Sequence, residues 1–187
     1  LSGLQKKKRD ALRRLIKQEK VKNALVFCNR KKDVDIVNKS FLKHGFNSAT
    51  LHGDMVQSAR MATMEKFKAR EYDFLICSDV AARGLDIEDM SHVFNFDVPM
   101  HAEDYVHRIG RTGRAGSEGE AASLVCVDEH KLLRDIEKLT KNEIPKEVVP
   151  GFEPDPSINP EPIQKPRGSR PNNSRRAPRQ NRPATRR

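Results

Sequence analysis

Short apolar runs that alternate with longer segments of helical periodicity are the feature of this sequence that most restricts its fold. The runs that fit strands are residues 24–28, 48–51, 73–77, 93–96 and 122–127. The segments in which apolar side chains recur at helical spacing are residues 4–19, 31–44, 56–69 and 128–141. Strands and helices that alternate in this way predict an α/β fold, with a mostly parallel sheet covered by helices on both faces.

Two residues suit the ends of the expected helices. Gly45 follows the helical segment at residues 31–44 and is a natural stop, because glycine adopts the left-handed conformation at little cost. Asp128 is suited to cap the amino end of the last helix, since its carboxylate can accept from backbone N–H groups. We therefore expect a helix boundary at each of these positions.

Polar residues and glycines come directly after several of the expected strands. They are Asn29, Gly53, residues 78–86 and Asp97. In parallel sheets of this kind, ligands bind outside the carboxyl ends of the strands. The functional site is therefore expected along that edge of the sheet.

A glycine- and arginine-rich stretch follows at residues 105–116. Its arginines stand at 108, 111 and 114, and its glycines at 110, 113 and 116. Glycine lets the backbone approach a partner closely, and the guanidinium fork matches phosphate oxygens. The stretch predicts a polyphosphate-binding loop; a solvated basic loop without a ligand is the alternative.

Five short motifs occur in a fixed order along the chain. They are VFCN (26–29), LHGD (51–54) with Gln57 and Arg60, SDVAARGLDI (78–87), VFNFDVP (93–99) and HRIGRTGRAG (107–116). Together they resemble the motifs of the DEAD-box ATP-dependent RNA helicases of superfamily 2, in their bacterial form. More narrowly, they resemble the second, C-terminal RecA-like domain, which has three layers. The resemblance covers residues 4–145.

The resemblance implies roles at an ATP site. Arg111 and Arg114 would reach the γ-phosphate as arginine fingers, and His107 would couple the ATP site to the RNA through the other domain. Gly84 and Asp86 would approach the ribose. Arg83 would join the contact between the domains.

The resemblance also implies that RNA is held by its sugar-phosphate backbone, without sequence preference. The implied positions are Asn29, Arg30, Gly53, Gln57, Arg60 and Ser78. Gln57 and Arg60 are three residues apart at a helix start, so both can face one RNA strand. Ser78 replaces a common threonine and keeps its hydroxyl, whereas Arg30 stands where the family commonly has a small hydroxyl residue.

No G-x-x-x-x-G-K-[ST] phosphate loop is present in the sequence. The acidic residues also stand outside any metal-holding motif, so no metal ligand is expected here. The chain therefore resembles one half of an ATPase, with ATP as cofactor and Mg²⁺ held by an N-terminal RecA-like domain of the same protein. The alternatives are a stand-alone RNA-binding or scaffold module and, less well matched by the motifs, a DNA helicase.

The positive charge is concentrated at the carboxyl end. Residues 162–187 hold eight arginines, Lys165 and no acid, so they carry nine of the ten net positive charges. Ten of the eleven prolines also lie at or beyond Pro145. We therefore expect a helicase C-terminal domain at residues 1–145, followed at 146–187 by a disordered basic tail that binds RNA or acidic partners.

The remaining composition argues for a cytoplasmic protein with reduced thiols and no membrane partner. Three cysteines lie in separate apolar runs, which fits neither a disulfide framework nor a zinc site. The histidines other than His107 show no metal-like pairing in the sequence. The run of bases at residues 6–9 is interpreted as a solvated helix face, with a nucleic-acid contact as the alternative.

Overall fold

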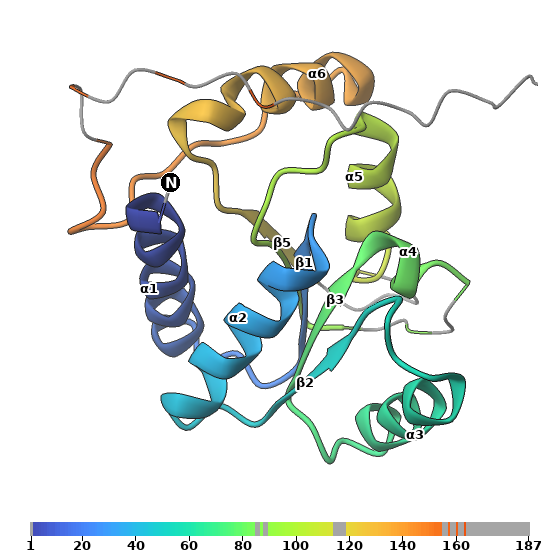
Figure 1. The fold of residues 1–187 in the computed structure, drawn as a ribbon. Coiled ribbons are helices and arrows are strands. Elements are labelled where there is room, and N and C mark those ends of the chain that lie inside the picture. The colour runs from blue at the N-terminus through green and yellow to red at the C-terminus, as the bar shows by residue number, and fades with distance from the viewer. Residues whose placement is uncertain are drawn as a thin grey trace, which may run out of the picture.

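The computed structural model of the chain describes residues 2–84, 87, 90–113, 119–154, 157, 160 and 163. These residues form a five-stranded sheet in which every pair of neighbours is parallel, in the order β2-β3-β1-β4-β5 (Figure 1). The strands are β1 (Ala24–Cys28), β2 (Ser48–Leu51), β3 (Phe74–Ser78), β4 (His92–Asn95) and β5 (Glu120–Ser123). The predicted α/β class with a parallel sheet is confirmed.

The helices include the four that were expected and two more that are short. They are α1 (Ser2–Gln18), α2 (Lys31–Lys43), α3 (Gln57–Lys68), α4 (Asp79–Ala82), α5 (Ala102–Ile109) and α6 (His130–Thr140), with a 3-10 turn, η1 (Val127–Glu129). Gly45 has a positive φ of 80°, as its expected role just past α2 requires. None of the helices described is long and apolar enough to span a membrane.

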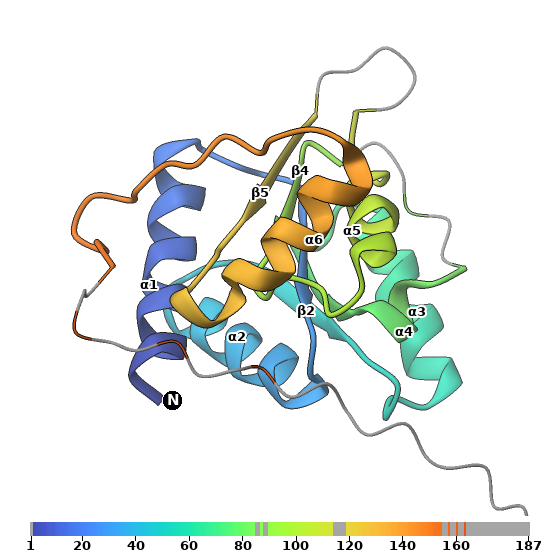
Figure 2. The same ribbon diagram turned by 90° about the horizontal axis from the view of Figure 1, so that it is seen from above.

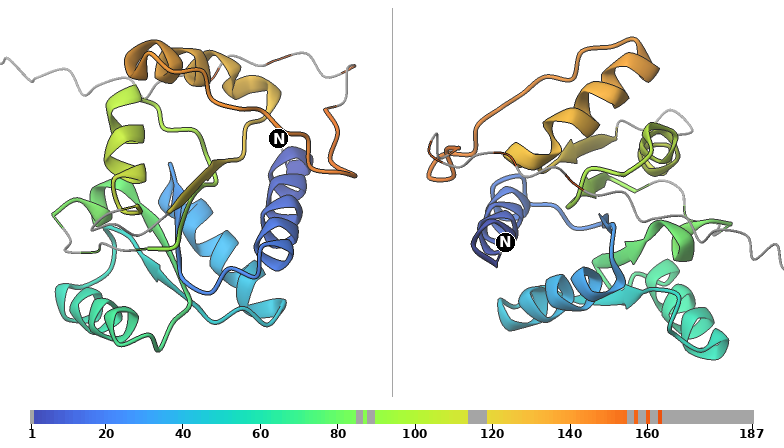
Figure 3. Two further views of the ribbon diagram at one scale, coloured as in Figure 1. Left: turned by 180° about the vertical axis from the view of Figure 1, so that it is seen from behind. Right: turned by 45° about the horizontal axis from the view of Figure 1, so that its top comes forward.

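The central strand shows how the helices cover both faces of the sheet. Ala24, Val26 and Cys28 of β1 belong to an apolar cluster with residues of α1 and α2. Leu25 and Phe27, which alternate with them, belong to a second cluster with residues of α3 and α4. Accordingly, α1 and α3 lie on opposite sides of the molecule (Figure 3). Because β1 is buried on both faces, its sequence is apolar throughout.

A third apolar cluster holds α5 and α6 together near the edge of the sheet formed by β4 and β5. Val98 and Tyr105 pack there against Leu132 and Ile136 of α6. The two helices lie side by side (Figure 2). The cluster fixes α5 beside the strand ends. This placement matters because α5 carries residues of the candidate site.

The last strand begins two residues before its predicted start and ends earlier. β5 pairs only with β4, and the register places Ser123 beside Asn95, the last residue of β4. Beyond that pair the partner strand has ended, although the Leu124 amide still donates to the Asn95 carbonyl at 2.9 Å. Residues 124–126 therefore continue the apolar run without being part of the strand.

The expectation that Asp128 caps the last helix is wrong. α6 begins at His130 and Glu129 precedes it, after the turn η1. The Glu129 carboxylate is buried and accepts from the backbone amides of Cys126 at 2.9 Å and Val98 at 3.0 Å. The side chain of Glu129 is longer than that of Asp128, and it points into the protein, where it reaches these two amides. The chain forms the turn η1 around this carboxylate before α6 begins.

The interpretation of residues 6–9 as a solvated helix face is wrong for Lys8. Its side chain is buried, and its ammonium donates to Glu129 Oε2 at 2.5 Å and to the Phe96 carbonyl at 3.0 Å. Burial opposes the charge, but the carboxylates of Glu129 and Asp97 outweigh this effect and raise the pKa of Lys8. The ammonium thus ties α1 to the segments that follow β4 and β5.

The cysteines are free, as expected, but they are not equally buried. Cys28 and Cys77 lie inside the sheet, and Cys126 is half-buried. Burial raises the pKa of Cys28 well above its usual value and that of Cys77 to about 12. Burial and the nearby Glu129 raise the pKa of Cys126 to about 11. All three are therefore held as thiols at neutral pH.

The segment after α6 runs back across the molecule toward α1 (Figures 1 and 2). The guanidinium of Arg14 in α1 donates to the Pro150 carbonyl at 2.6 Å, and Phe152 packs against the first apolar cluster. These contacts lie beyond residue 145, where the folded domain was expected to end. Apart from Lys146, the basic residues of the predicted tail lie at or beyond Lys165, outside the described residues.

Candidate functional site

The carboxyl edge of the sheet gathers the residues that follow β1, β3 and β4. Register pairs Cys28 of β1 with Ser78 of β3, so Asn29 and Asp79 follow on adjacent strands. On the other side of β1, Phe27 pairs with Asn95 of β4. The polar residues that the sequence placed after separate strands are thus neighbours, as a parallel sheet requires.

Arg108 of α5 lies at the centre of this edge, with 1 % of its surface exposed. Its Nε and Nη2 donate to the two carboxylate oxygens of Asp79 at 2.6 and 2.7 Å. Nη1 donates to Asn95 Oδ1 at 3.1 Å and to the Asp97 carbonyl at 2.8 Å. Nη2 also donates to Asn29 Oδ1 at 2.8 Å. All five N–H groups of the guanidinium therefore have protein acceptors.

The buried position of Arg108 corrects one part of the sequence interpretation. The spacing of the arginines in the sequence predicts that Arg108 binds polyphosphate together with Arg111 and Arg114. Instead, it forms a bidentate ion pair inside the protein, and its guanidinium lies 5.1 Å from the centre of the Phe27 ring. Arg108 lies in the last turn of α5, which ends at Ile109, and the helix directs its side chain inward just before the glycine-rich turn begins.

Asn29 is held by the same network. Its backbone amide donates to Asp97 Oδ2 at 3.0 Å, and its side-chain Nδ2 donates to the Val98 carbonyl at 2.8 Å. Because its Oδ1 accepts from Arg108, the side chain makes two hydrogen bonds and the residue as a whole makes three. Arg30, the next residue, is exposed. The end of β1 is thus rigid at Asn29 and open to solvent one residue later.

A shallow pocket lies against Arg108 on the side of α4 and α5. Its lining residues are Phe27, Asp79, Ala82, Arg83, Asp104, His107, Arg108 and Arg111. Three of the predicted ATP-site residues, His107, Arg111 and Arg83, therefore surround one depression. His107 is exposed and Arg111 is half-buried.

Arg83 and Gly84 form the turn that follows α4. Arg83 is exposed and forms an ion pair with Asp104 of α5, with Nη2 2.7 Å from Oδ1. Gly84 has a φ of 71°, a left-handed conformation that residues with a Cβ rarely adopt. Asp86, predicted to approach the ribose, and Arg114, predicted as an arginine finger, lie outside the described residues.

The loop that carries Arg111 is attached to the turn before β4. The Met90 amide donates to the Arg111 carbonyl at 3.2 Å. The Thr112 hydroxyl donates to the Met90 carbonyl. Gly113 follows with a φ of 67°. These bonds fix the backbone at Arg111, so its side chain starts from a defined position beside the pocket.

The remaining predicted RNA positions lie along the same edge, over α3 and β3. Gly53 and Gln57 are exposed, and Ser78 is half-buried at the end of β3, where it makes no side-chain cap. Arg60 is also half-buried: its Nη2 donates to the Ala81 carbonyl at 3.3 Å, and its Nε is buried without a partner among the residues described. Arg60 is therefore anchored toward α4, unlike a freely solvated surface charge.

Sequence reasoning missed the residues that hold the site together. Asp79, Asn95 and Asp97 all lie in recognised motifs, yet no role was assigned to them. A detectable signal was present: each is polar and stands at or just after the end of a buried strand. Such residues need partners when their strands are neighbours. Arg108 binds the side chains of Asp79 and Asn95. It binds Asp97 only through the backbone carbonyl, and the Asp97 carboxylate accepts from the Asn29 amide instead.

The model of the helicase conserved C-terminal domain matches residues 7–116. The ATP-dependent RNA helicase CshA of Limosilactobacillus reuteri is 46 % identical over 132 residues, which are 71 % of this chain and 27 % of that protein. The chain thus spans less than a third of the length of this curated relative.

Two solved structures support the same assignment. Escherichia coli DEAD-box protein SrmB, bound to regulator of ribonuclease activity A, aligns with a TM-score of 0.76 and 34 % identity, over 85 % of this chain and 92 % of that one. S. cerevisiae Dbp5 bound to RNA and ADP BeF3 aligns with a TM-score of 0.65 and 32 % identity, over 70 % and 35 %. The chain belongs to the helicase conserved C-terminal domain family and has the RecA-like fold of that domain in the DEAD-box proteins.

Proposed function

We propose that this chain supplies the second half of an ATP-dependent RNA helicase. In this function, an N-terminal RecA-like domain of the same protein holds the phosphates and Mg²⁺. Arg111 and Arg114 then complete the ATP site from across the cleft, with Gly84 and Asp86 at the ribose and Arg83 and His107 at the domain contact. The names of the relatives, which are ATP-dependent RNA helicases, support this proposal.

RNA is proposed to lie across the carboxyl edge, held through its sugar-phosphate backbone. The residues proposed to contact it are Asn29, Arg30, Gly53, Gln57, Arg60 and Ser78. Contacts to phosphate and sugar carry no sequence information, so binding is expected to be non-specific. Closure of the two domains on RNA would bend one strand and separate the duplex locally, and hydrolysis of ATP would release it.

The observation that carries the proposal is the network around Arg108. It joins Asn29 and the β3 end, which lie on the proposed RNA side, to α5, which carries His107 and leads into Arg111. A movement of the proposed RNA-binding residues would therefore be transmitted through Arg108 to α5, on the proposed ATP side. Such a connection supports coupling between the proposed RNA side and the proposed ATP side.

Replacing either arginine finger tests the proposal. In the protein that includes the preceding domain, Arg111→Ala and Arg114→Ala should each reduce RNA-stimulated ATP turnover by at least about a hundredfold, because arginine fingers contribute roughly 10³–10⁵ in rate. Arg111→Lys should have a higher ATP turnover than Arg111→Ala but a lower one than the unaltered protein, since lysine keeps the charge and lacks the bidentate fork. The melting temperature and nucleotide-free RNA binding should stay close to those of the unaltered protein.

Arg134→Ala, on the exposed face of α6, is the matched control and should leave turnover unchanged. Normal turnover in both finger variants would mean that these arginines do not act on the phosphate. A large fall in melting temperature would assign them a structural role instead.

A further inference from the structure

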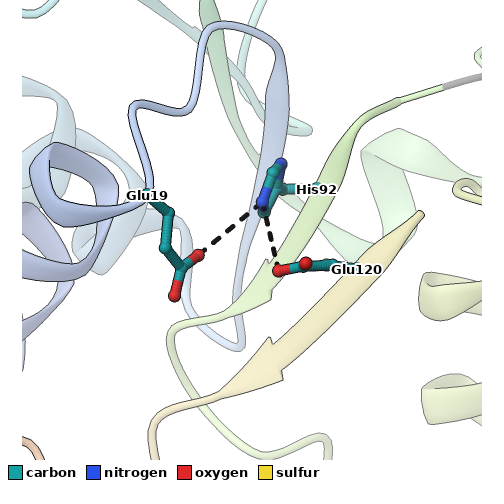
Figure 4. Close-up of side chains that lie close together, drawn as sticks. All are labelled: Glu19, His92 and Glu120. Atoms are coloured by element: carbon teal, nitrogen blue, oxygen red, sulfur yellow. Dashed lines mark ion pairs between the residues drawn. The ribbon is translucent and has the colours of Figure 1, made fainter. Parts of the chain in front are cut away.

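The amino edge of the sheet, opposite the candidate site, holds a cluster of three side chains with metal-ligating atoms. His92, the first residue of β4, lies between Glu19, which follows α1, and Glu120, the first residue of β5 (Figure 4). Its Nε2 is 3.6 Å from Glu19 Oε2 and 3.4 Å from Glu120 Oε2. The three ligand atoms all lie within 4.8 Å of one another.

The fold sets this arrangement. The parallel register of β4 and β5 pairs His92 directly with Glu120. Glu19 is held at the end of α1, where its amide donates to the Leu15 carbonyl at 3.0 Å. The histidine ring is also fixed, because it is stacked on Phe94 with the ring centres 5.8 Å apart and only 11° between the planes. The histidine showed no pairing in the sequence because its two partners are distant along the chain.

Hydrogen bonds outside the cluster determine the tautomer of His92, and therefore whether Nε2, the ring nitrogen that faces the carboxylates, carries a lone pair. The Ser91 hydroxyl is 2.6 Å from the Asn23 carbonyl, which can only accept, so the hydroxyl donates its one proton there. His92 Nδ1, 2.9 Å from the same hydroxyl oxygen, must then be the donor. In the neutral ring, Nε2 carries the lone pair that faces both glutamates.

Three lone-pair-bearing atoms that face one another form a favourable position for a cation. The His92 Nε2 distances of 3.6 and 3.4 Å are close to the neighbouring-ligand spacing of a tetrahedral site, which is about 3.3–3.4 Å when the metal–ligand bonds are 2.0–2.1 Å. The two glutamate oxygens lie within 4.8 Å of each other. Imidazole favours Zn²⁺ over Mg²⁺ and Ca²⁺, which prefer oxygen ligands alone. Ser91 supplies the outer hydrogen bond that orients a metal-binding histidine.

We propose that Glu19, His92 and Glu120 form a Zn²⁺ site, with water as the fourth ligand. The ion links the end of α1 to β4 and β5 at the edge of the sheet away from the proposed ATP and RNA contacts. It is therefore a structural clamp, and it binds only when the three segments are in place. This inference does not depend on the proposed helicase function.

Isothermal titration of the metal-free chain with ZnCl₂ tests the site, with MgCl₂ as the comparison ion. One equivalent of Zn²⁺ should bind in preference to Mg²⁺. Glu120→Gln and His92→Gln should each weaken Zn²⁺ binding by at least about tenfold, because each removes a ligand. The controls Glu65→Gln and His101→Gln, both at exposed positions away from the cluster, should bind as the unaltered chain does.

Thermal melting provides the second measurement. Zn²⁺ at about a hundred times its Kd should raise the melting temperature by roughly 5–11 °C in the unaltered chain and the controls, and not in the two ligand variants. Because the side chain of Glu120 is 71 % exposed, Glu120→Gln should fold normally even if His92→Gln does not.

A proton is the rival occupant, since an imidazolium could pair with both carboxylates. In that case, Zn²⁺ would bind the unaltered chain no more tightly than it binds Glu120→Gln, and it would not shift the melting temperature. Either result would overturn the zinc site. Equal affinity for Mg²⁺ would overturn the choice of metal.

Discussion

Arg108 is buried with its charge, and its environment explains why this is tolerated. An isolated cation in the protein interior is costly, but a carboxylate partner and complete hydrogen bonding can offset that cost. Arg108 has both, because Asp79 accepts two of its bonds and Asn29, Asn95 and the Asp97 carbonyl accept the others. The planar fork of arginine is what lets one side chain reach four residues at once.

Arg108→Lys should therefore destabilise the protein strongly even though it keeps the charge. Lysine has three donors on one nitrogen and cannot span these acceptors, so several buried polar atoms would lose their partners. Disruption of a buried pair costs about 3–5 kcal/mol. This corresponds to a fall of roughly 6–20 °C in melting temperature for a domain of this size.

Differential scanning calorimetry of the chain measures this effect. Arg134→Lys on exposed α6 is the matched control and should melt within about 1 °C of the unaltered chain, as exposed substitutions usually do. If Arg108→Lys melts at the same temperature as the control, the network does not stabilise the fold.

Glu137 of α6 attaches the segment that follows the helix. Its carboxylate accepts from the Ile144 amide at 3.3 Å and lies 3.1 Å from the Lys146 ammonium. The hydrogen bond from Lys146, with that from the Ile144 amide, lowers the pKa of Glu137. Ile144 also packs on the cluster between α5 and α6. The turn after α6 is thus fixed by charge and by apolar contact together.

Glu137→Gln should weaken this attachment in a pH-dependent way. A carboxyl whose pKa is lowered on folding contributes stability above its unfolded value, near 4.5, and loses it as the pH falls through the lower folded value. The variant should therefore melt below the unaltered chain at pH 7, and the difference should vanish as the pH is lowered below about 4.5.

Melting curves at several pH values give this comparison directly. Glu147→Gln, an exposed glutamate in the same segment, is the control and should follow the unaltered chain throughout. A difference between Glu137→Gln and the unaltered chain that does not change with pH would contradict the role of the charge.

The strands and the longer helices of the molecule could be predicted from the sequence, because they depend on local patterns of apolar residues. β1 and β3 are apolar on both faces, so their runs marked them clearly as buried strands. Which arginine points inward depends on how α5 packs against α6, and local spacing does not contain that information. The same holds for Lys8 and for His92, whose partners are on distant segments. The sequence therefore predicted that the site lies at the carboxyl edge of the sheet, but it did not predict the contacts between the residues there.

The charge distribution of the whole chain predicts where non-specific RNA affinity lies. Residues 164–187 carry Lys165, eight arginines and no acid. Deletion of these residues should weaken RNA binding and flatten its salt dependence, because each lost phosphate contact on single strands changes the log–log slope by about 0.7. The deletion keeps Ile163, which packs on the cluster between α5 and α6.

Binding to a single-stranded RNA, measured by fluorescence anisotropy over a series of salt concentrations, provides both quantities. A tail of the same length with its basic residues replaced by serine separates charge from chain length, and it should behave like the deletion. Unchanged affinity and slope after deletion would place the binding on the folded edge instead.

ATP turnover tests most directly whether this chain is half of an ATP site. Steady-state hydrolysis with saturating RNA should be measured for the chain alone, for the preceding domain alone and for the two joined. Because the sequence lacks a phosphate loop, we expect no turnover by the chain alone and RNA-stimulated turnover only by the joined protein. Hydrolysis by the isolated chain, or full activity of the preceding domain without it, would contradict this account.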